Sequence, residues 1–210
     1  MEKPVLLYVD RLYTSPYAMS VFVGMQEKGI PFEVRTVDLD AGGQHAPDYA
    51  AQSLTQRVPT LVDGDFRLSE SSAITEYLDD VYPGVPLYPA DAKLKARARQ
   101  VQAWLRSDLL PIRQERSTDV IFLQRSDAPL SPAAQVAAQK LFDATDALLA
   151  DGAEYLFGAW SIADVDLALM LHRLIANGDA VPPKLVAYAQ RQWQRPTVQA
   201  WVSRERAPLG

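Results

Sequence analysis

The residues best suited to ligand chemistry are concentrated between positions 57 and 77. There, Ser-Glu-Ser-Ser at 69–72 directly precedes apolar residues at helical spacing, which predicts a helix that begins in a hydroxyl-rich turn. Unpaired N–H groups and the helix dipole favour an anion at such a start, and Ser71 and Ser72 add hydroxyl donors. Glu70 offers a carboxylate to an amine. These groups together suit a small zwitterionic peptide.

The residues just before this turn supply strand-like backbone. Two short β-like runs, Thr60 to Val62 and Phe66 to Leu68, flank Asp63-Gly64, a dipeptide favoured in tight hairpins. Pro59 stands at the entrance to the first run, where a proline marks a strand start, an edge or a cis turn. If the bond is cis, Val58 can present its N–H and C=O to a peptide-like ligand.

The order of these features resembles a known family. Val-Pro-Thr-Leu at 58–61, followed by Leu-Ser-Glu-Ser-Ser-Ala-Ile at 68–74, is similar to the glutathione-binding signature of the cytosolic glutathione S-transferases. The resemblance implies a cis-proline at Pro59 and a grip by Glu70 and Ser71 on the γ-glutamyl end of glutathione. The alternative for this stretch alone is a generic hairpin followed by an N-capped helix.

Composition and charge exclude several other kinds of chemistry. The 210 residues carry a net charge of −5, which argues against a general nucleic-acid binder. Cysteine is absent, so disulfides, zinc-thiolate sites and redox chemistry at a protein thiol are excluded, and with only two histidines we expect no metal. The sequence shows no signal-peptide pattern and no apolar run approaching about 20 residues, so we expect a cytoplasmic protein without a membrane span.

The first part of the chain is predicted to be a thioredoxin-like domain. Val5 to Val9 and Phe32 to Val37 are predicted strands, and between them a helix begins after Thr14-Ser15-Pro16 and stops at Gly29. With the later hairpin and its helix, the order becomes β-α-β, a loop over 38–56, and β-β-α. Ser15 therefore lies at a helix N-terminus immediately after a strand.

A proline-rich segment divides the chain. Residues 82–89 contain three prolines and one glycine, which predicts a stiff extended linker. We expect a thioredoxin-like, glutathione-binding domain over 1–82, a linker over 83–90 and an all-helical domain over 91–210. The fold class is therefore α/β followed by all-α.

The helical part contains several amphipathic segments. Apolar residues between 94 and 112 predict one long helix with a kink at Pro111, and Ser131-Pro132 predicts the start of another helix with Val136 on its buried side. Further helices are expected around 183–193 and 196–204.

Two short motifs in this part also resemble the family. Ser161 and Asp164 have the spacing of a capping box and match the Ser/Thr-x-x-Asp helix cap of its C-terminal domain, which implies a structural role. The run 100–113 looks closest to the bacterial YfcF-type glutathione transferases.

The resemblance implies that the protein makes the glutathione thiol a thiolate. A free thiol has a pKa of about 8.5, and a hydroxyl that donates to sulfur at a helix N-terminus favours the anion. Ser15 has both features, and Thr14-Ser15-Pro16-Tyr17 resembles the serine version of the family's site, so Ser15 is assigned as catalytic. Tyr8 is the tyrosine alternative, interpreted as a packed strand aromatic. A capping role alone is the alternative for Ser15.

The remaining site residues follow from the same resemblance. Val58 would pair with the cysteinyl backbone of glutathione, and Gln44 is assigned to its glycine carboxylate, with His45 as the competing residue and solvation of both as the alternative. Asp108 is a candidate for reaching the amine from a partner subunit. Trp104 is a candidate for lining the electrophile site, as is Ile112, each with the helical core as its alternative.

The sequence therefore predicts a glutathione transferase that attacks a small hydrophobic electrophile, with reduction of organic hydroperoxides as a second reaction. Glutathione is the co-substrate, no nucleic acid or membrane partner is expected, and the family implies a homodimer. The alternative is a non-catalytic protein-interaction or regulatory module with the same fold. A hydrolase that uses Ser15 is disfavoured, because neither His45 nor His172 lies in a motif that points to this serine.

Overall fold

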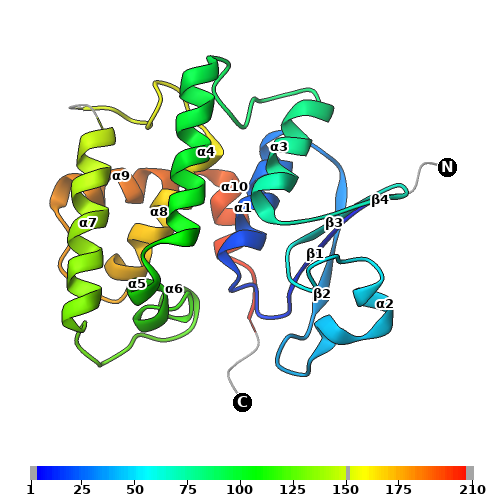
Figure 1. Cartoon of the computed structure of the whole chain (residues 1–210), viewed down its shortest axis with the longest axis horizontal. Helices are drawn as coiled ribbons and strands as arrows, with labels where there is room; N and C mark the ends of the chain where they lie inside the picture. The colour runs from blue at the N-terminus through cyan, green and yellow to red at the C-terminus, as the bar shows by residue number, and fades with distance from the viewer. Residues whose placement is uncertain (1–3, 150–151, 207–210) are drawn as a thin grey trace. The chain divides into compact units, whose positions relative to one another are not determined.

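The computed structural model of the chain describes residues 4–149 and 152–206. They form two compact units (Figure 1). Of the described residues, the first unit contains those up to Leu87 together with 203–206, and the second contains those from Tyr88 to Val202.

The first unit is built on a four-stranded sheet with the strand order β2-β1-β3-β4. The strands are β1 (Val5–Asp10), β2 (Phe32–Val37), β3 (Thr60–Asp63) and β4 (Phe66–Ser69). β1 pairs in parallel with β2 and antiparallel with β3, and β3 pairs antiparallel with β4. A parallel pair needs a crossover connection, which helix α1 (Pro16–Glu27) supplies.

Helices complete this unit in the expected order. A 3-10 helix, η1 (Gly43–His45), and the short α2 (Pro47–Ala50) follow β2, and α3 (Ser71–Val81) follows β4 and packs against α1. The core between sheet and helices is fully buried and includes Leu7, Val9, Met25, Leu61 and Ile74. The predicted thioredoxin-like order is confirmed.

The tight hairpin between β3 and β4 is also confirmed. Asp63 pairs with Phe66 at its closed end, and Gly64 in the turn has a φ of 59°. Residues with a Cβ rarely adopt that backbone conformation, so the Asp-Gly dipeptide determines where the chain reverses. The reversal places the end of β4 opposite the start of β3, where Thr60 pairs with Ser69.

The second unit is helical. Its core is centred on α8, which packs against α4 and α9 and buries Leu167 and Leu171 completely. The helices are α4 (Ala92–Ser107), α5 (Leu110–Glu115), α6 (Asp119–Phe122), α7 (Pro132–Leu148), α8 (Ile162–Ile175), α9 (Pro183–Trp193) and α10 (Pro196–Val202). The expected fold class, a thioredoxin-like domain followed by a helical domain, is confirmed.

One helix expected around Pro111 is instead two helices. α4 ends at Ser107 and α5 begins at Leu110, because Leu109 adopts a left-handed conformation with a φ of 56°. Pro111 lies in the first turn of α5, where its missing N–H breaks no intrahelical bond. The prediction of one kinked helix was wrong.

The buried face of α7 also differs from the expectation. Val136 is 71% exposed, whereas Ala134, Ala138 and Leu141 are buried. Positions three, four and seven apart share a helix face, and Val136, two residues from both alanines, points to the opposite side. The expected burial of Val136 was wrong.

The capping box at the start of α8 is confirmed. The Asp164 carboxylate accepts hydrogen bonds from the backbone nitrogen of Ser161 at 2.9 Å, from that of Leu156 at 2.9 Å and from the Tyr188 hydroxyl at 2.8 Å. Both residues of the box are fully buried, and burial raises the pKa of Asp164 above its ordinary value. This carboxylate serves the fold of the helical unit.

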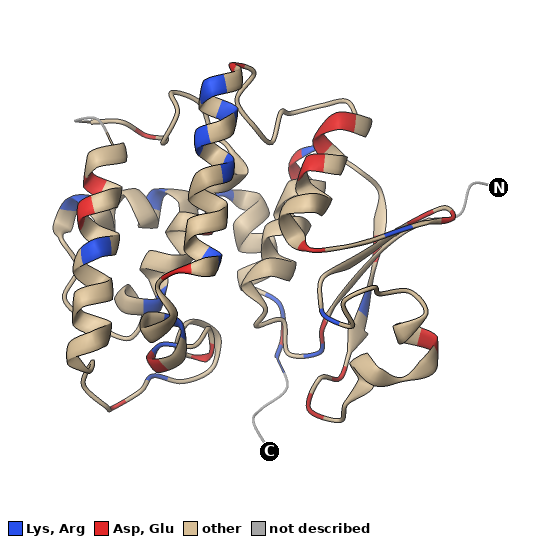
Figure 2. Ribbon diagram, in the orientation of Figure 1, with Lys and Arg blue, Asp and Glu red and all other residues tan. Residues whose placement is uncertain are grey.

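The charges on α4 are distributed around the helix. Figure 2 shows Lys and Arg at several levels of it, and Lys93, Arg97 and Arg99 are exposed. Lys95 lies over the ring of Tyr88, 5.7 Å from the centroid. In the part of the chain that the structure describes, no helix has the length and apolar character needed to cross a membrane.

Candidate active site

A cavity of about 610 Å³ lies in the first unit. Three segments line it: the end of β1 with the start of α1, the loop after β2, and the residues just before β3. Its lining residues are Asp10, Thr14, Ser15, Pro16, Tyr17, Leu39, Gln44, His45, Thr55, Gln56, Arg57 and Val58. The structure thus brings together three of the sequence-predicted site residues, Ser15, Gln44 and Val58.

Ser15 is the N-cap of α1. Its Oγ accepts a hydrogen bond from the backbone nitrogen of Ala18 at 3.2 Å, and Pro16 occupies the first helical position. Because this capping bond uses an oxygen lone pair, the hydroxyl keeps its O–H for donation to a ligand. The residue therefore combines a hydroxyl donor with the positive end of a helix dipole at the wall of the cavity.

Asp10 holds the turn that leads to Ser15. Its buried carboxylate accepts hydrogen bonds from the backbone nitrogen of Thr14 at 2.7 Å, the Thr14 hydroxyl at 3.1 Å and the backbone nitrogen of Ser15 at 3.0 Å. Sequence reasoning missed this role. A signal exists, because an aspartate shortly before a Thr-Ser-Pro helix start can bond the backbone of the following turn.

The segment before β3 contributes backbone and a cation. The Val58–Pro59 peptide bond is cis, as the resemblance implied. Val58 lines the cavity, and Pro59 is buried. Arg57, which is exposed, also lines the cavity and brings a positively charged residue to the segment that contains Val58. Sequence reasoning did not single out Arg57.

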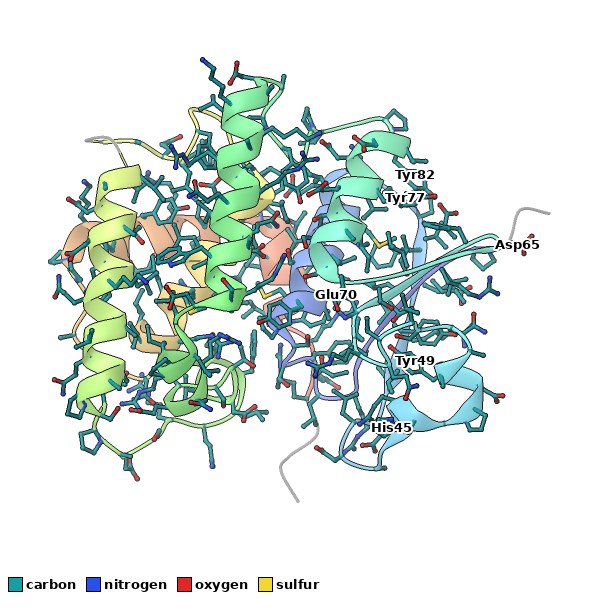
Figure 3. All side chains as sticks on the ribbon, viewed as in Figure 1. His45, Tyr49, Asp65, Glu70, Tyr77 and Tyr82 are labelled. Atoms are coloured by element: carbon teal, nitrogen blue, oxygen red, sulfur yellow. The ribbon has the colours of Figure 1, made fainter. Side chains whose placement is uncertain are left out.

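Gln44 and His45 both face this cavity. His45 Nδ1 lies 2.9 Å from Gln56 Oε1, and its Nε2 lies 3.4 Å from Gln44 Nε2. These partners assign the tautomer with a proton on Nδ1, because Gln56 then accepts while Gln44 donates to Nε2. The three side chains form one hydrogen-bonded chain, with His45 marked in Figure 3.

Glu70 and Ser71 lie where β4 ends and α3 begins, as Figure 3 shows for Glu70. Among the residues that the structure describes, neither lines the 610 Å³ cavity. Glu70 is exposed at a φ of 73°, whereas Ser71 is buried. A residue with a Cβ rarely adopts such a backbone conformation, which costs of order 1–3 kcal/mol. Backbone strain of this kind is concentrated at functional sites.

The aromatic and apolar alternatives lie elsewhere. Tyr8 packs edge-to-face on Tyr49 with ring centroids 5.4 Å apart, which confirms its interpretation as a packed strand aromatic. Ile112 is fully buried in the helical core. Trp104 lines a separate cavity of about 340 Å³ within the second unit and donates from Nε1 to the Asp108 carboxylate at 3.0 Å.

Asp108 is engaged within its own unit. Its carboxylate pairs with Lys140 and accepts from the backbone nitrogen of Leu109 at 2.9 Å. The hydrogen bond from Lys140 is the main cause that lowers the pKa of Asp108 to about 2. Within residues 4–149 and 152–206, no group of three or more His, Cys, Asp or Glu side chains could hold a metal ion.

A thioredoxin-like unit with a serine-capped first helix and a cis-proline before its third strand, followed by a helical unit, defines a protein of the glutathione transferase class. Family models support this directly. The models described as the N-terminal and C-terminal domains of glutathione S-transferase match residues 11–86 and 91–206. The chain belongs to the glutathione S-transferase family.

Individual relatives agree with this assignment. Human glutathione S-transferase theta-1 is 36% identical over 200 residues, which cover 88% of this chain and 80% of the relative. A glutathione transferase homolog from Burkholderia BGR1, solved with bound glutathione, is 50% identical, with a TM-score of 0.77 over 95% of this chain and 96% of the other. A theta class glutathione S-transferase from Xanthomonas axonopodis, also with glutathione, is 25% identical, with a TM-score of 0.78 over 98% and 99%.

Proposed function

We propose that this glutathione transferase binds glutathione in the 610 Å³ cavity and activates its thiol with Ser15. The observation that carries the proposal is that a helix-capping serine and the backbone segment at the cis Val58–Pro59 bond line one cavity. The solved relative that is 50% identical was crystallised with glutathione bound, which supports the same ligand here.

The chemical role of Ser15 is to stabilise a thiolate. Its O–H donates to the glutathione sulfur, and the N-terminal dipole of α1 favours the negative charge, so the pKa of the thiol falls below about 8.5 and its proton passes to solvent. The sulfur electron pair then attacks an electrophilic carbon of a small hydrophobic substrate. A carbon–sulfur bond forms, and the leaving group departs with its electron pair.

The remaining residues hold the tripeptide. The backbone of Val58, next to Pro59, pairs with the cysteinyl unit, and the γ-glutamyl end extends beyond the 610 Å³ cavity to Glu70 and Ser71, which bind its amine and carboxylate. Gln44 binds the glycine carboxylate. Arg57 supports this assignment, because the residue lines the same cavity and its side chain carries a positive charge that attracts a carboxylate.

The test is a calorimetric titration of the purified protein with reduced glutathione. We expect saturable binding that Glu70→Ala weakens, and Ser15→Ala should mainly remove conjugation of chlorodinitrobenzene. Absence of binding at millimolar glutathione would contradict the enzyme proposal and favour the alternative, a non-catalytic interaction module.

The same thiolate is suited to organic hydroperoxides. Sulfur attacks the terminal oxygen, the O–O bond breaks, and the alcohol leaves after protonation. Because the chain has no cysteine, a second glutathione must reduce the resulting sulfenic acid, with release of glutathione disulfide and water. Consumption of cumene hydroperoxide at only the uncatalysed rate would rule this reaction out.

Three further assignments are proposals that rest on the family and the sequence. We propose a homodimer, which sedimentation would test, and a cytoplasmic location. The run 100–113 supports placement with the bacterial YfcF-type transferases.

A further inference from the structure

A cluster of four buried hydroxyls lies behind the cavity segment that contains Arg57 and Val58. We call it the hydroxyl cluster. Its members come from α2, the residues after it, and the first and last residues of the β3–β4 hairpin. They are Tyr49, Ser53, Thr60 and Ser69, none more than 8% exposed.

Three of these hydroxyls converge on one backbone oxygen, the carbonyl of Arg57. The Tyr49 hydroxyl lies 2.7 Å from it, the Thr60 hydroxyl 3.1 Å and the Ser53 hydroxyl 3.3 Å. A carbonyl has two lone pairs, so two hydroxyls can donate to it while the third donates within the cluster. Burial raises the pKa of Tyr49, which keeps its phenol protonated as a donor.

This convergence determines the direction of the next N–H group. The Arg57 carbonyl and the Val58 N–H belong to one planar trans peptide, in which they point in opposite directions. Because the carbonyl points into the hydroxyl cluster, the Val58 N–H points away from it, and Val58 lines the cavity. The hydroxyl cluster therefore determines the orientation of the Val58 N–H, and its side chains need not contact that group to do so.

The cluster also reaches the other end of the proposed peptide site. Ser69 Oγ lies 3.1 Å from Ser53 Oγ and 3.4 Å from Thr60 Oγ1. Ser69 directly precedes Glu70, whose backbone has the unusual φ of 73°. Ser53 and Thr60, whose hydroxyls contact the Arg57 carbonyl, therefore also contact the hydroxyl of Ser69, the residue directly before Glu70 and α3.

We propose that Tyr49, Ser53 and Thr60 are positioning residues for glutathione. Their hydroxyls hold the Arg57 carbonyl inward, and so hold the Val58 N–H in the orientation that the cysteinyl backbone of the tripeptide requires. This inference rests on the proposed function, because it presupposes that Val58 contacts glutathione.

The sharpest test is a matched pair of substitutions at Thr60. Thr60→Val keeps the side-chain shape and removes the hydroxyl, whereas Thr60→Ser keeps the hydroxyl and removes the methyl group. We expect Thr60→Val to raise the Kd and KM for glutathione about fivefold, the factor that one ordinary hydrogen bond is worth, with kcat little changed. Thr60→Ser should bind as the wild type does.

A second pair tests the phenol. Tyr49→Phe should weaken glutathione binding by a similar factor. Tyr77→Phe is its control, since Tyr77 donates at 2.8 Å to Asp63 in the same unit but does not line the cavity. Figure 3 labels both tyrosines, one on α2 and the other on α3.

Calorimetry with reduced glutathione, steady-state kinetics with chlorodinitrobenzene and melting curves decide the outcome. If the wild type binds and Thr60→Val binds equally well, the inference is overturned while the proposed function stands. A purely structural role is indicated if Thr60→Ser weakens binding as much as Thr60→Val, or if affinity merely follows the Tm. If Tyr49→Phe does not fold, the Thr60 pair alone decides. A wild type that does not bind overturns the proposed function, and this inference with it.

Discussion

The Asp10 carboxylate and the backbone nitrogen of Ser15 lie 3.0 Å apart, and this bond links the end of β1 directly to the cap of α1. Two more bonds from Thr14 to the same carboxylate close the turn between them. The position of the proposed catalytic hydroxyl is therefore determined by a buried anion that belongs to the sheet.

Replacing this anion should loosen the turn. Asp10→Asn keeps the size of the side chain but substitutes an NH2 group for one accepting oxygen, so at least one donor of the turn loses its partner. We expect a lower Tm, since an unsatisfied buried donor costs about 1–3 kcal/mol of stability, and a lower kcat/KM, because the Ser15 hydroxyl is then held less firmly. Glu33→Gln, at an exposed ion pair on β2, is the control and should change neither quantity. Unchanged activity in Asp10→Asn would contradict the positioning role.

The proposed role of Ser15 predicts a change in pH dependence. Removing its O–H by Ser15→Ala takes away the donor to sulfur, so the pKa of bound glutathione should rise toward that of the free thiol, about 8.5. At pH 7 the rate should fall about 10- to 100-fold, and it should recover as the pH is raised. Ultraviolet absorption of the thiolate, measured across pH on the bound complex, checks this. An equal thiol pKa in both proteins would leave Ser15 as a cap only.

A substitution of Arg57 tests where the glycine carboxylate of glutathione binds. Arg57→Gln removes the positive charge of a residue that lines the cavity, so it should weaken glutathione binding about tenfold. Glutathione monoethyl ester, which lacks the glycine charge, should lose far less affinity on the same substitution. If the ester and the acid lose affinity equally, Arg57 does not contact that carboxylate.

Asp164 should matter for stability and not for chemistry. Asp164→Ala leaves the backbone nitrogens of Leu156 and Ser161 and the Tyr188 hydroxyl without their acceptor, so the free energy of unfolding should fall by about 2 kcal/mol or more. Denaturant titration measures this, with Asp146→Ala, at an exposed ion pair, as the control. Loss of activity at an unchanged Tm is the result that would contradict the assignment.

His172 should make stability depend on pH. It stacks on Trp193 with centroids 4.0 Å apart, Nδ1 lies 2.8 Å from the Ala168 oxygen, and burial lowers its pKa to about 4. Between pH 6.5 and 4 the His172 side chain binds a proton in the unfolded chain but not in the folded chain. The titration of this residue therefore leaves the free energy of unfolding at its full value above pH 6.5, and lowers it by about 3 kcal/mol as the pH drops to 4. His172→Phe should remove this slope from denaturant titrations. An identical slope in both proteins would assign it to other groups.

Much of the fold could be predicted because its signals are local. The Asp63-Gly64 turn, the Ser15-Pro16 helix start and the Ser161–Asp164 box each depend on residues within a few positions, and each is present in the structure. The break before α5 was missed because a proline gives the same signal inside a kinked helix and in the first turn of a new one.

The site was harder to predict, because its parts meet only after folding. Nothing in the sequence around Tyr49 indicates that its hydroxyl bonds the Arg57 carbonyl, since the short helix α2 that carries it has too few residues to show a periodic pattern. The position of Arg57 in the cavity lining was missed because an exposed arginine beside a strand is most often solvated, and the sequence does not show when it lies at a cavity instead. Pattern reasoning therefore named the residues of the motif and missed those that the tertiary structure adds to it.

The hydroxyl cluster contains three alcohols and one phenol, none of which carries charge near neutral pH, and burial raises the pKa of its phenol further. Contacts between such groups vary little with ionic strength or with acidity in the physiological range. The orientation of the Val58 N–H is consequently constant under conditions that change the ionisation of the glutathione sulfur. The groups that orient the Val58 N–H therefore differ from those that control the ionisation of the sulfur, so a change of acidity can alter how fast the bound thiol reacts without altering the orientation of this backbone donor.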